Sequence, residues 1–271
     1  MLSKIKRRLG YLFTRDGREF LRLWWTCARR ARYMPLSDVR FSGLTFDVTD
    51  APSFFWQYVD IFRDQSYFFK AETSAPVIYD CGANIGMSVA WFKQLYPDAR
   101  VVAFEADKTI YDHLRRNLER NGLMEGVVLH NAAVWTDHDG VSFAPDGADG
   151  GHVSSSGGTK VPSIALRAML EAEPRIDFLK MDIEGAEMVV VPDIQPILKN
   201  VWYFFCEYHC DMTRRGGHVP LGRILSILDQ EGFDYVLMPV GIHAGRPFED
   251  SPSVWQANIF AKDPAKIEGL P

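Results

Sequence analysis

A glycine-rich turn and a nearby acid are the first residues of the sequence that suggest a ligand. The turn 80–86 (DCGANIG) directly follows the apolar run 77–79, and Glu105 ends the next apolar run. A carboxylate at that second position can accept hydrogen bonds from both hydroxyls of a ribose. A dinucleotide fingerprint needs glycine where Asp80 stands, and an acid there would repel a pyrophosphate but suit an amine. These residues therefore predict an adenosine-like ligand without a pyrophosphate.

A second group of acids follows later apolar runs. Segment 180–187 (KMDIEGAE) ends one expected strand, and segment 206–209 (CEYH) ends the next. If these strands are neighbours, the catalytic candidates Asp182, Glu207 and His209 lie together at the edge of the sheet. Three interpretations stay open: His209 or Asp182 is a general base, the three residues bind a divalent metal that lowers the pKa of a hydroxyl, or the cluster is structural. We expect Lys180 to balance the charge of the acids.

Alternating strand and helix patterns must position these residues. A hydrophobic content of 47% and a charged content of 24% exclude wholesale disorder. Strands separated by helices indicate βαβ units, and hence an α/β domain with a doubly wound, mostly parallel sheet, which we place at residues 41–265. The expected strands are 77–79, 100–104, 127–129, 176–181, 201–206, 233–237 and 254–261, and the expected helices include 52–62, 87–95, 108–121 and 221–230. The glycine- and serine-rich segment 145–159 is expected to be a mobile loop.

Residues 1–40 are expected to form a basic helical appendage on an acidic body. Segment 1–33 holds ten Lys or Arg and only two acids, although the net charge of the chain is −5. A basic helix with Trp and Leu on one face can lie on an anionic membrane surface, dock or form a homo-oligomer; contact with nucleic acid is expected least. The four cysteines form no C-x-x-C pair, and no run of about eighteen apolar residues occurs. We therefore expect a cytoplasmic protein, peripheral at the inner membrane surface if the appendage binds lipid.

Five segments occur in a fixed order between residues 76 and 210: VIYDCGANIG, VVAFEAD, LHNAAV, FLKMDIEGAE and FCEYH. Together they resemble the FkbM family of S-adenosylmethionine-dependent methyltransferases. KMDIEGAE is the most specific segment, whereas many methyltransferases share the D-x-G-x-x-x-G turn. The resemblance is weakest in the N-terminal helices and after Tyr208, so it says least about the substrate.

The resemblance implies a class I methyltransferase fold, which is Rossmann-like with a mostly parallel seven-stranded sheet. It also implies S-adenosyl-L-methionine as cofactor and O-methylation of a hydroxyl on a sugar, a glycan or a related natural product. By position, the residues around the methionine part of the cofactor would be Asp80, Gly82, Asn84 and Gly86. The residues that would hold its ribose and adenine are Glu105, Asn131 and Ala132. Asp182 would face both the sulfonium and the acceptor hydroxyl.

Other functions compete with this interpretation. The main alternative is a non-enzymatic nucleotide-binding scaffold whose basic N-terminus binds a membrane or nucleic acid. Asp80 disfavours an NAD-dependent enzyme, because it replaces the first glycine of the fingerprint. Base methylation is disfavoured because segment 181–184 (MDIE) stands where the tetrapeptide [DNS]-P-P-[FYW] would be. The expected partner is a small-molecule or glycan acceptor.

Overall fold

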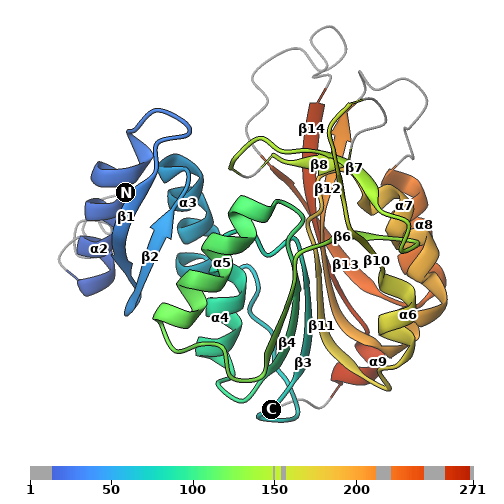
Figure 1. Cartoon of the computed structure of the whole chain (residues 1–271). Helices are drawn as coiled ribbons and strands as arrows, with labels where there is room; N and C mark the ends of the chain where they lie inside the picture. The colour runs from blue at the N-terminus through green and yellow to red at the C-terminus, as the bar shows by residue number, and fades with distance from the viewer. Residues whose placement is uncertain (1–13, 149, 154–156, 212–220, 241–253, 269–271) are drawn as a thin grey trace, which may run out of the picture.

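The computed structural model describes residues 14–148, 150–153, 157–211, 221–240 and 254–268. A seven-stranded sheet with helices on both faces forms its centre (Figure 1). From one edge to the other, the strands are β13 (Asp234–Val240), β14 (Val254–Lys262), β12 (Val201–Asp211), β11 (Ile176–Met181), β3 (Val77–Cys81), β4 (Arg100–Phe104) and β5 (Val127–His130). Each of them overlaps a strand expected from the sequence.

The order and direction of the strands define the fold. Neighbours from β5 across to β12 are parallel, while β14 is antiparallel to both β12 and β13. Within this sheet, the first strand along the sequence is β3, in the middle. The next two, β4 and β5, lie successively further out on one side, and β11 then pairs with β3 on the other side. Ligands bind at such a reversal of strand order, outside the carboxyl ends of the strands. This is the expected class I methyltransferase fold.

Helices cover both faces of the sheet, and each face has its own hydrophobic core. On one face lie α4 (Met87–Leu95) and α5 (Lys108–Arg120), and on the other lie α6 (Leu166–Glu171), α7 (Glu187–Ile194) and α8 (Leu221–Gln230) (Figure 1). Phe92 and Leu114 are fully buried in the first core, and Val190 and Leu228 in the second. All six positions of β11 are buried, as a strand covered on both faces requires. Two shorter helices are η3 (Gln195–Asn200) and α9 (Pro264–Ile267).

Small strands lie between β5 and α6, both within segment 145–159, which was expected to be a mobile loop, and on either side of it. β6 (Ala133–Trp135) pairs in parallel with β10 (Ser163–Ala165). β7 (Val141–Ala144) pairs antiparallel with both β8 (His152–Val153) and β9 (Thr159–Val161). Part of segment 145–159 is therefore ordered against β7. Residues 149 and 154–156 of this segment lie outside the described residues.

The N-terminal elements share a core with the first face of the sheet. They are α2 (Arg15–Leu23), the π-helix η1 (Trp24–Ala28), β1 (Leu36–Phe41), β2 (Leu44–Val48), α3 (Ala51–Gln57) and the π-helix η2 (Tyr58–Arg63). Leu23 and Cys27 are fully buried in the same core as Phe41 and Phe54. The boundary expected at residue 40 falls inside β1, so no structural break separates the basic helix from the body at that point.

Among the described residues, no helix combines the length and the apolar character that crossing a membrane requires.

Candidate active site

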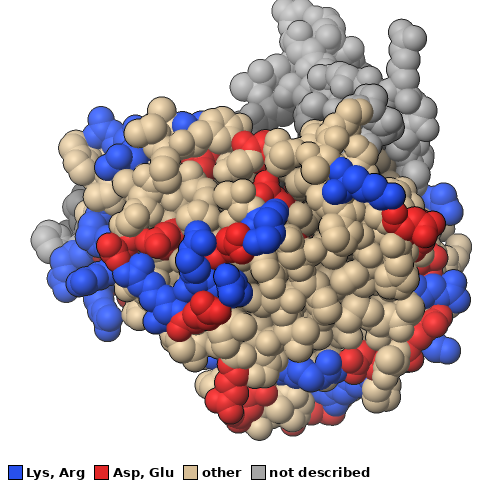
Figure 2. Space-filling model, viewed as in Figure 1, with Lys and Arg blue, Asp and Glu red and all other residues tan. Residues whose placement is uncertain are grey.

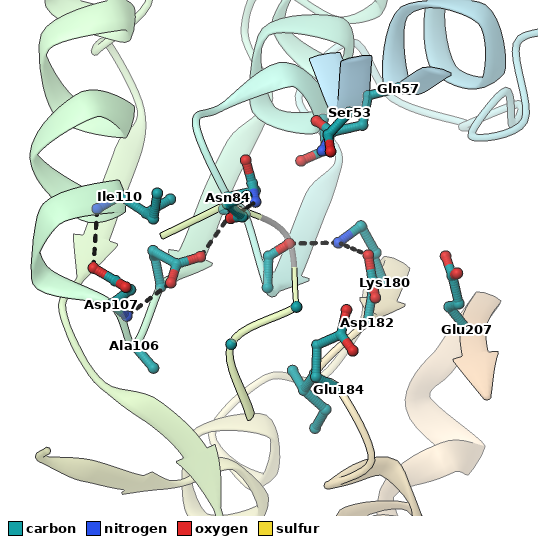
Figure 3. A pocket seen from close by; sticks show the side chains of 18 of the residues that line it. Ser53, Gln57, Asn84, Ala106, Asp107, Ile110, Lys180, Asp182, Glu184 and Glu207 are labelled. Carbon is teal, nitrogen blue, oxygen red and sulfur yellow. Dashed lines mark hydrogen bonds and ion pairs between the residues drawn. The ribbon is translucent and has the colours of Figure 1, made fainter. Parts of the chain in front are cut away.

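A cavity of about 1070 Å³ lies at the carboxyl ends of the central strands. The residues expected to bind a ligand that line it are Gly82, Asn84, Glu105, Ala132, Asp182 and Glu207. Four other candidates do not line it: Asp80, Gly86, Asn131 and His209. Figure 3 shows Asn84 and Asp107 on one side, and Asp182, Glu184 and Glu207 on the other. The cavity therefore has two distinct halves, which the ends of β3–β4 and β11–β12 build.

The two glycines of the turn after β3 are required by packing. Gly82 has a φ of +87°, and a Cβ there would lie 1.8 Å from the backbone oxygen of Asp182. Gly86 has a φ of +99°, and its Cβ would lie 2.9 Å from a methyl group of Leu114. The turn after β3 is thus pressed against the turn after β11 and against α5. The two glycines therefore leave room for other parts of the chain.

We expect Gly82→Ala to destabilise the protein by about 2–4 kcal/mol, because it combines a left-handed backbone with a steric clash. Urea unfolding of the full chain measures this loss. Gly222→Ala is the matched control, since among the described residues no atom lies within 4 Å of a Cβ at that helical position. Equal stability of the two variants would contradict the close contact between Gly82 and Asp182.

A buried ion pair, rather than a ligand, is the partner of Asp80. Asp80 is fully buried, and one carboxylate oxygen lies 3.3 Å from Lys180 Nζ. Lys180 also donates a hydrogen bond to the Gly82 oxygen (2.6 Å) and lies 3.5 Å from Asp182 Oδ2. Burial alone would lower the pKa of Lys180, but Asp80 and Asp182 raise it above its ordinary value. Lys180 therefore stays charged and ties the turns after β3 and β11 together.

Glu105 is held in place by the backbone of two turns. Its two carboxylate oxygens accept hydrogen bonds from the amides of Asn84 (3.0 Å) and Asp107 (2.8 Å). Burial raises the pKa of Glu105 to about 7. Asn131 does not reach the cavity; it donates a hydrogen bond to the Glu105 backbone oxygen (2.9 Å), while Ala132 beside it lines the wall. Glu105 is therefore a fixed acceptor on this side of the cavity.

Four carboxylates surround His209 at the end of β12. His209 Nε2 lies 3.5 Å from Glu184, 3.7 Å from Glu207 and 4.0 Å from Asp182. Its Nδ1 lies 3.3 Å from the fully buried Glu187. Asp182, Glu207 and His209 each offer a ligand atom, and these three atoms lie within 4.8 Å of one another. The structure thus brings the three catalytic candidates together, as adjacent parallel strands should.

The charges around His209 determine its protonation. Burial alone would lower the pKa of His209, but Glu187, Glu184 and Asp182 raise it to about 10. Burial raises the pKa of both Glu184 and Glu207 to about 8. A general base must be unprotonated before it acts, and this imidazole carries its proton at neutral pH. The environment of His209 therefore disagrees with the expectation that it is the base.

A comparison with protein families identifies the chain. The family model described as the methyltransferase FkbM domain matches residues 80–235, more than half of the sequence. The chain belongs to the FkbM methyltransferase family. The matched range begins at Asp80 and includes Glu105, Asp182, Glu207 and His209. The resemblance expected from the sequence motifs is confirmed.

Three relatives of this FkbM methyltransferase show what it is similar to. Methyltransferase sdnD of Sordaria araneosa is 28% identical over 214 residues, which cover 65% of this chain and 81% of the relative. The 2-O-methyltransferase NoeI of Sinorhizobium fredii is 27% identical over 180 residues, covering 58% and 72%. The hexuronic acid methyltransferase AglP of Haloferax volcanii is 29% identical over 172 residues, covering 59% and 69%.

Glu187, the last residue of segment 180–187 in this FkbM methyltransferase, holds the turn after β11 together. Its carboxylate accepts hydrogen bonds from the amides of Ile183 (2.7 Å) and Gly185 (2.8 Å) and contacts His209. Glu184 adopts a φ of +55° in this tight turn, and its side chain lies on the cavity wall. Sequence reasoning counted these acids but assigned no role to either. The short spacing of the acids in segment 180–187 was the signal in the sequence that could have indicated a role for them. The geometry of the turn that places Glu184 and Glu187 could not be predicted from the sequence.

Several other cavity residues of this FkbM methyltransferase were missed by sequence reasoning. Ser53, Gln57 and Asp60 reach the cavity from α3 and η2. Asn258 on β14 pairs with Glu207 on β12 and also lines the cavity. Its Oδ1 atom is buried and accepts no hydrogen bond within the described part of the chain. No motif marked these residues, because they lie on elements far from the two acidic segments.

Three aromatic residues of segment 56–67 differ in their exposure. Tyr58 and Tyr67 are buried among other aromatic rings, including Phe41 and Phe205. Trp56 is 63% exposed and lines the cavity. Tyr67 also lines the cavity, but Trp56, which packs edge-on against Phe55, is the exposed ring of the three.

Because the pKa values of groups in the acidic cluster are raised, we expect the stability of the protein to fall as the pH rises. The folded chain holds the proton of His209 more tightly than the unfolded chain, so this contribution is complete below about pH 6.5 and lost as the pH passes 10. Glu184 and Glu207 also bind protons more tightly when folded, so their contribution is lost between about pH 4.5 and 8. We expect the free energy of unfolding, measured with urea and a chelator, to decrease from pH 6 to pH 9.

Glu184→Gln should flatten this pH dependence, because it removes one of the groups that take up protons on folding. Glu119→Gln on the exposed surface of α5 is the control and should leave the slope as it is. A stability that rises with pH over this range would contradict the protonation assigned to the cluster.

Proposed function

We propose that this chain transfers the methyl group of S-adenosylmethionine to a hydroxyl oxygen of a sugar or glycan. The observation that supports this most is the division of one cavity between Glu105 and the acidic cluster around Asp182. One half offers an acceptor for ribose hydroxyls, and the other offers groups that can take a proton from an alcohol. The name of one relative, a 2-O-methyltransferase, specifies transfer to oxygen, and that of another specifies a hexuronic acid.

The first half of the cavity fits the nucleoside of the cofactor. Each Glu105 oxygen accepts one backbone amide and keeps a lone pair for a ribose hydroxyl. Ala106, Ile110 and Ala132 provide an apolar wall for an adenine ring. We assign the methionine part to the space beside Gly82 and Asn84. When bound, S-adenosylmethionine supplies an already activated methyl group, so the protein has to align the acceptor oxygen and remove its proton.

The second half of the cavity fits the acceptor hydroxyl. In the first version of the mechanism, the carboxylate of Asp182 or Glu207 accepts the hydroxyl proton, since both line the cavity. A carboxylate whose pKa is raised to about 8, as for Glu207, is well matched to this task near neutral pH. Protonated His209 then keeps the acids in place through Glu184 and Glu187. The buried Asn258 oxygen can accept a hydrogen bond from another acceptor hydroxyl.

In the second version, Asp182, Glu207 and His209 bind a divalent metal. Their ligand atoms lie within 4.8 Å of one another, which a single ion can span. Two carboxylates and one imidazole fit Mg²⁺ or Mn²⁺. Such an ion would lower the pKa of the acceptor hydroxyl. It would also offset the repulsion among the acids of the cluster.

The test of this function is methyl transfer from S-adenosylmethionine carrying a labelled methyl group to a panel of neutral sugars, uronic acids and lipid-linked sugars. We expect the label on a hydroxyl oxygen of one sugar class. Label recovered only on nitrogen would contradict O-methylation. Tight binding of S-adenosylmethionine with no transfer to any hydroxyl would favour the non-enzymatic scaffold, which membership of a methyltransferase family does not favour.

A further inference from the structure

One face of the N-terminal helix is exposed and carries both arginine and large apolar side chains. Residues Arg18, Leu21, Arg22, Trp25 and Arg29 recur at spacings of three and four, so they lie on the same side of α2 and η1. All five are exposed, and Trp25 is 65% exposed. The opposite side of the same helix is buried through Leu23 and Cys27. The helix therefore uses one apolar stripe for the core and presents a second surface outward.

The charge of this surface is strongly positive. Between residues 14 and 40, seven arginines are exposed, against two exposed acids, Asp16 and Asp38. Lys and Arg side chains gather over this part of the molecule, on the left of Figure 2. Arg29 lies over the rings of Trp24 (5.4 Å) and Trp25 (4.2 Å), which orients its charge beside the indoles. Indole rings beside arginine are typical of helices that lie in the headgroup region of a bilayer.

The same surface continues to the cavity. Arg32 and Tyr33 follow the helix directly and line the cavity, as does Trp56 on α3. Trp24 and Tyr33 are also exposed. Anything that covers the arginine- and tryptophan-bearing face therefore lies next to this wall of the cavity.

We propose that this face of α2 and η1 docks on an anionic membrane surface. Its arginines bind lipid phosphates, and Leu21, Trp24 and Trp25 enter the headgroup layer. Anionic lipid is the occupant because the face combines a large positive charge with exposed indoles and Leu21 along one helix, whereas a nucleic-acid duplex is bound mainly through its phosphates. Docking of this kind brings the cavity to the membrane surface, where a membrane-anchored acceptor would be within reach if the proposed function holds.

The test is co-sedimentation of the full chain with lipid vesicles. We expect binding to vesicles of phosphatidylcholine containing about 30% phosphatidylglycerol, weak binding to phosphatidylcholine alone, and loss of binding in about 0.5 M NaCl. R29E/R30E should weaken binding at least tenfold. R115E/R116E on the exposed side of α5 makes the same change in net charge elsewhere and should retain most of the binding.

Trp25→Ala removes an indole that would enter the headgroup layer but leaves the positive charge of the face unchanged. It should weaken vesicle binding severalfold. Phe68→Ala removes another ring, 52% exposed, outside the face and is its control. Equal binding to neutral vesicles, or equal losses in R29E/R30E and R115E/R116E, would overturn the proposal. So would a preference for an oligonucleotide, or a dimer that Trp25→Ala dissolves without any vesicle binding. Because the assay contains neither cofactor nor acceptor, it is independent of methyl transfer.

Discussion

Replacing Asp182 by asparagine should lower the rate of methyl transfer by about 10²–10⁴, the usual contribution of a positioned proton acceptor. Asp182 has a place in both versions of the mechanism, as one of the two carboxylates that can accept the proton and as a metal ligand. It lines the cavity, and it lies 3.5 Å from Lys180 and 4.0 Å from His209. The amide keeps the size of the side chain but neither accepts a proton nor balances a cation. The expected loss is in kcat, with the Kd of S-adenosylmethionine, measured by calorimetry, changed by less than about fivefold.

Chelation distinguishes the two versions. If a metal is used, EDTA should abolish turnover, Mg²⁺ or Mn²⁺ should restore it, and His209→Ala should be about as damaging as Asp182→Asn. If a carboxylate is the base, EDTA should have no effect, and the rate should rise with pH as Glu207, whose pKa is raised to about 8 by burial, loses its proton. Asp234→Asn on the exposed surface of β13 is the control. An Asp182→Asn enzyme with nearly full activity would contradict the metal version and would exclude Asp182 as the base, leaving only Glu207 in that role.

The second large effect should follow from Glu105. We expect Glu105→Ala to weaken S-adenosylmethionine binding by about 1.5–3 kcal/mol, the scale of hydrogen bonds lost to a charged group. Because burial raises the pKa of Glu105 to about 7, the carboxylate becomes protonated as the pH falls from 8 to 6, and the affinity of the wild-type chain should fall over the same range. Calorimetry of the full chain at several pH values measures both effects.

A cofactor analogue separates a direct ribose contact from support of the turn, because Glu105 also accepts the amides of Asn84 and Asp107. A 2′-deoxy analogue should bind the wild-type chain more weakly than S-adenosylmethionine, but should lose little further affinity in Glu105→Ala. If the affinity lost through the analogue and the affinity lost through Glu105→Ala simply add, the result would contradict a direct contact between Glu105 and the ribose. Glu125→Gln on the exposed surface serves as the control, and thermal unfolding checks that each variant is folded.

Much of the fold follows from local patterns. Apolar runs followed by Asp80-Cys81-Gly82 and by Glu105 place both segments at strand ends, because each run is long enough for one buried strand. Strands separated by helices require crossovers, which determine that the two ends meet at the same edge of the sheet. The convergence of Asp182, Glu207 and His209 was predictable for the same reason.

The N-terminal region shows where local pattern stops being informative. Periodicity marked a basic amphipathic helix, but it did not distinguish an appendage from a part of the core. The structure buries Leu23 and Cys27 beside Phe41 and leaves Trp25 exposed. Which of two apolar stripes is covered depends on contacts with β1 and α3, which are distant in sequence.

The sequence by itself predicted an adenosine-like ligand, the strands that carry the candidate site and the residues that meet at the sheet edge. The tertiary structure alone decided the surroundings of those residues: Asp80 pairs with Lys180 instead of facing the cavity, and the carboxylates around His209 raise its pKa. The physical reason is that charge interactions and burial depend on distances between side chains from different elements. Glu187 and His209, 22 residues apart in sequence, lie 3.3 Å apart only after α7 and β12 have packed.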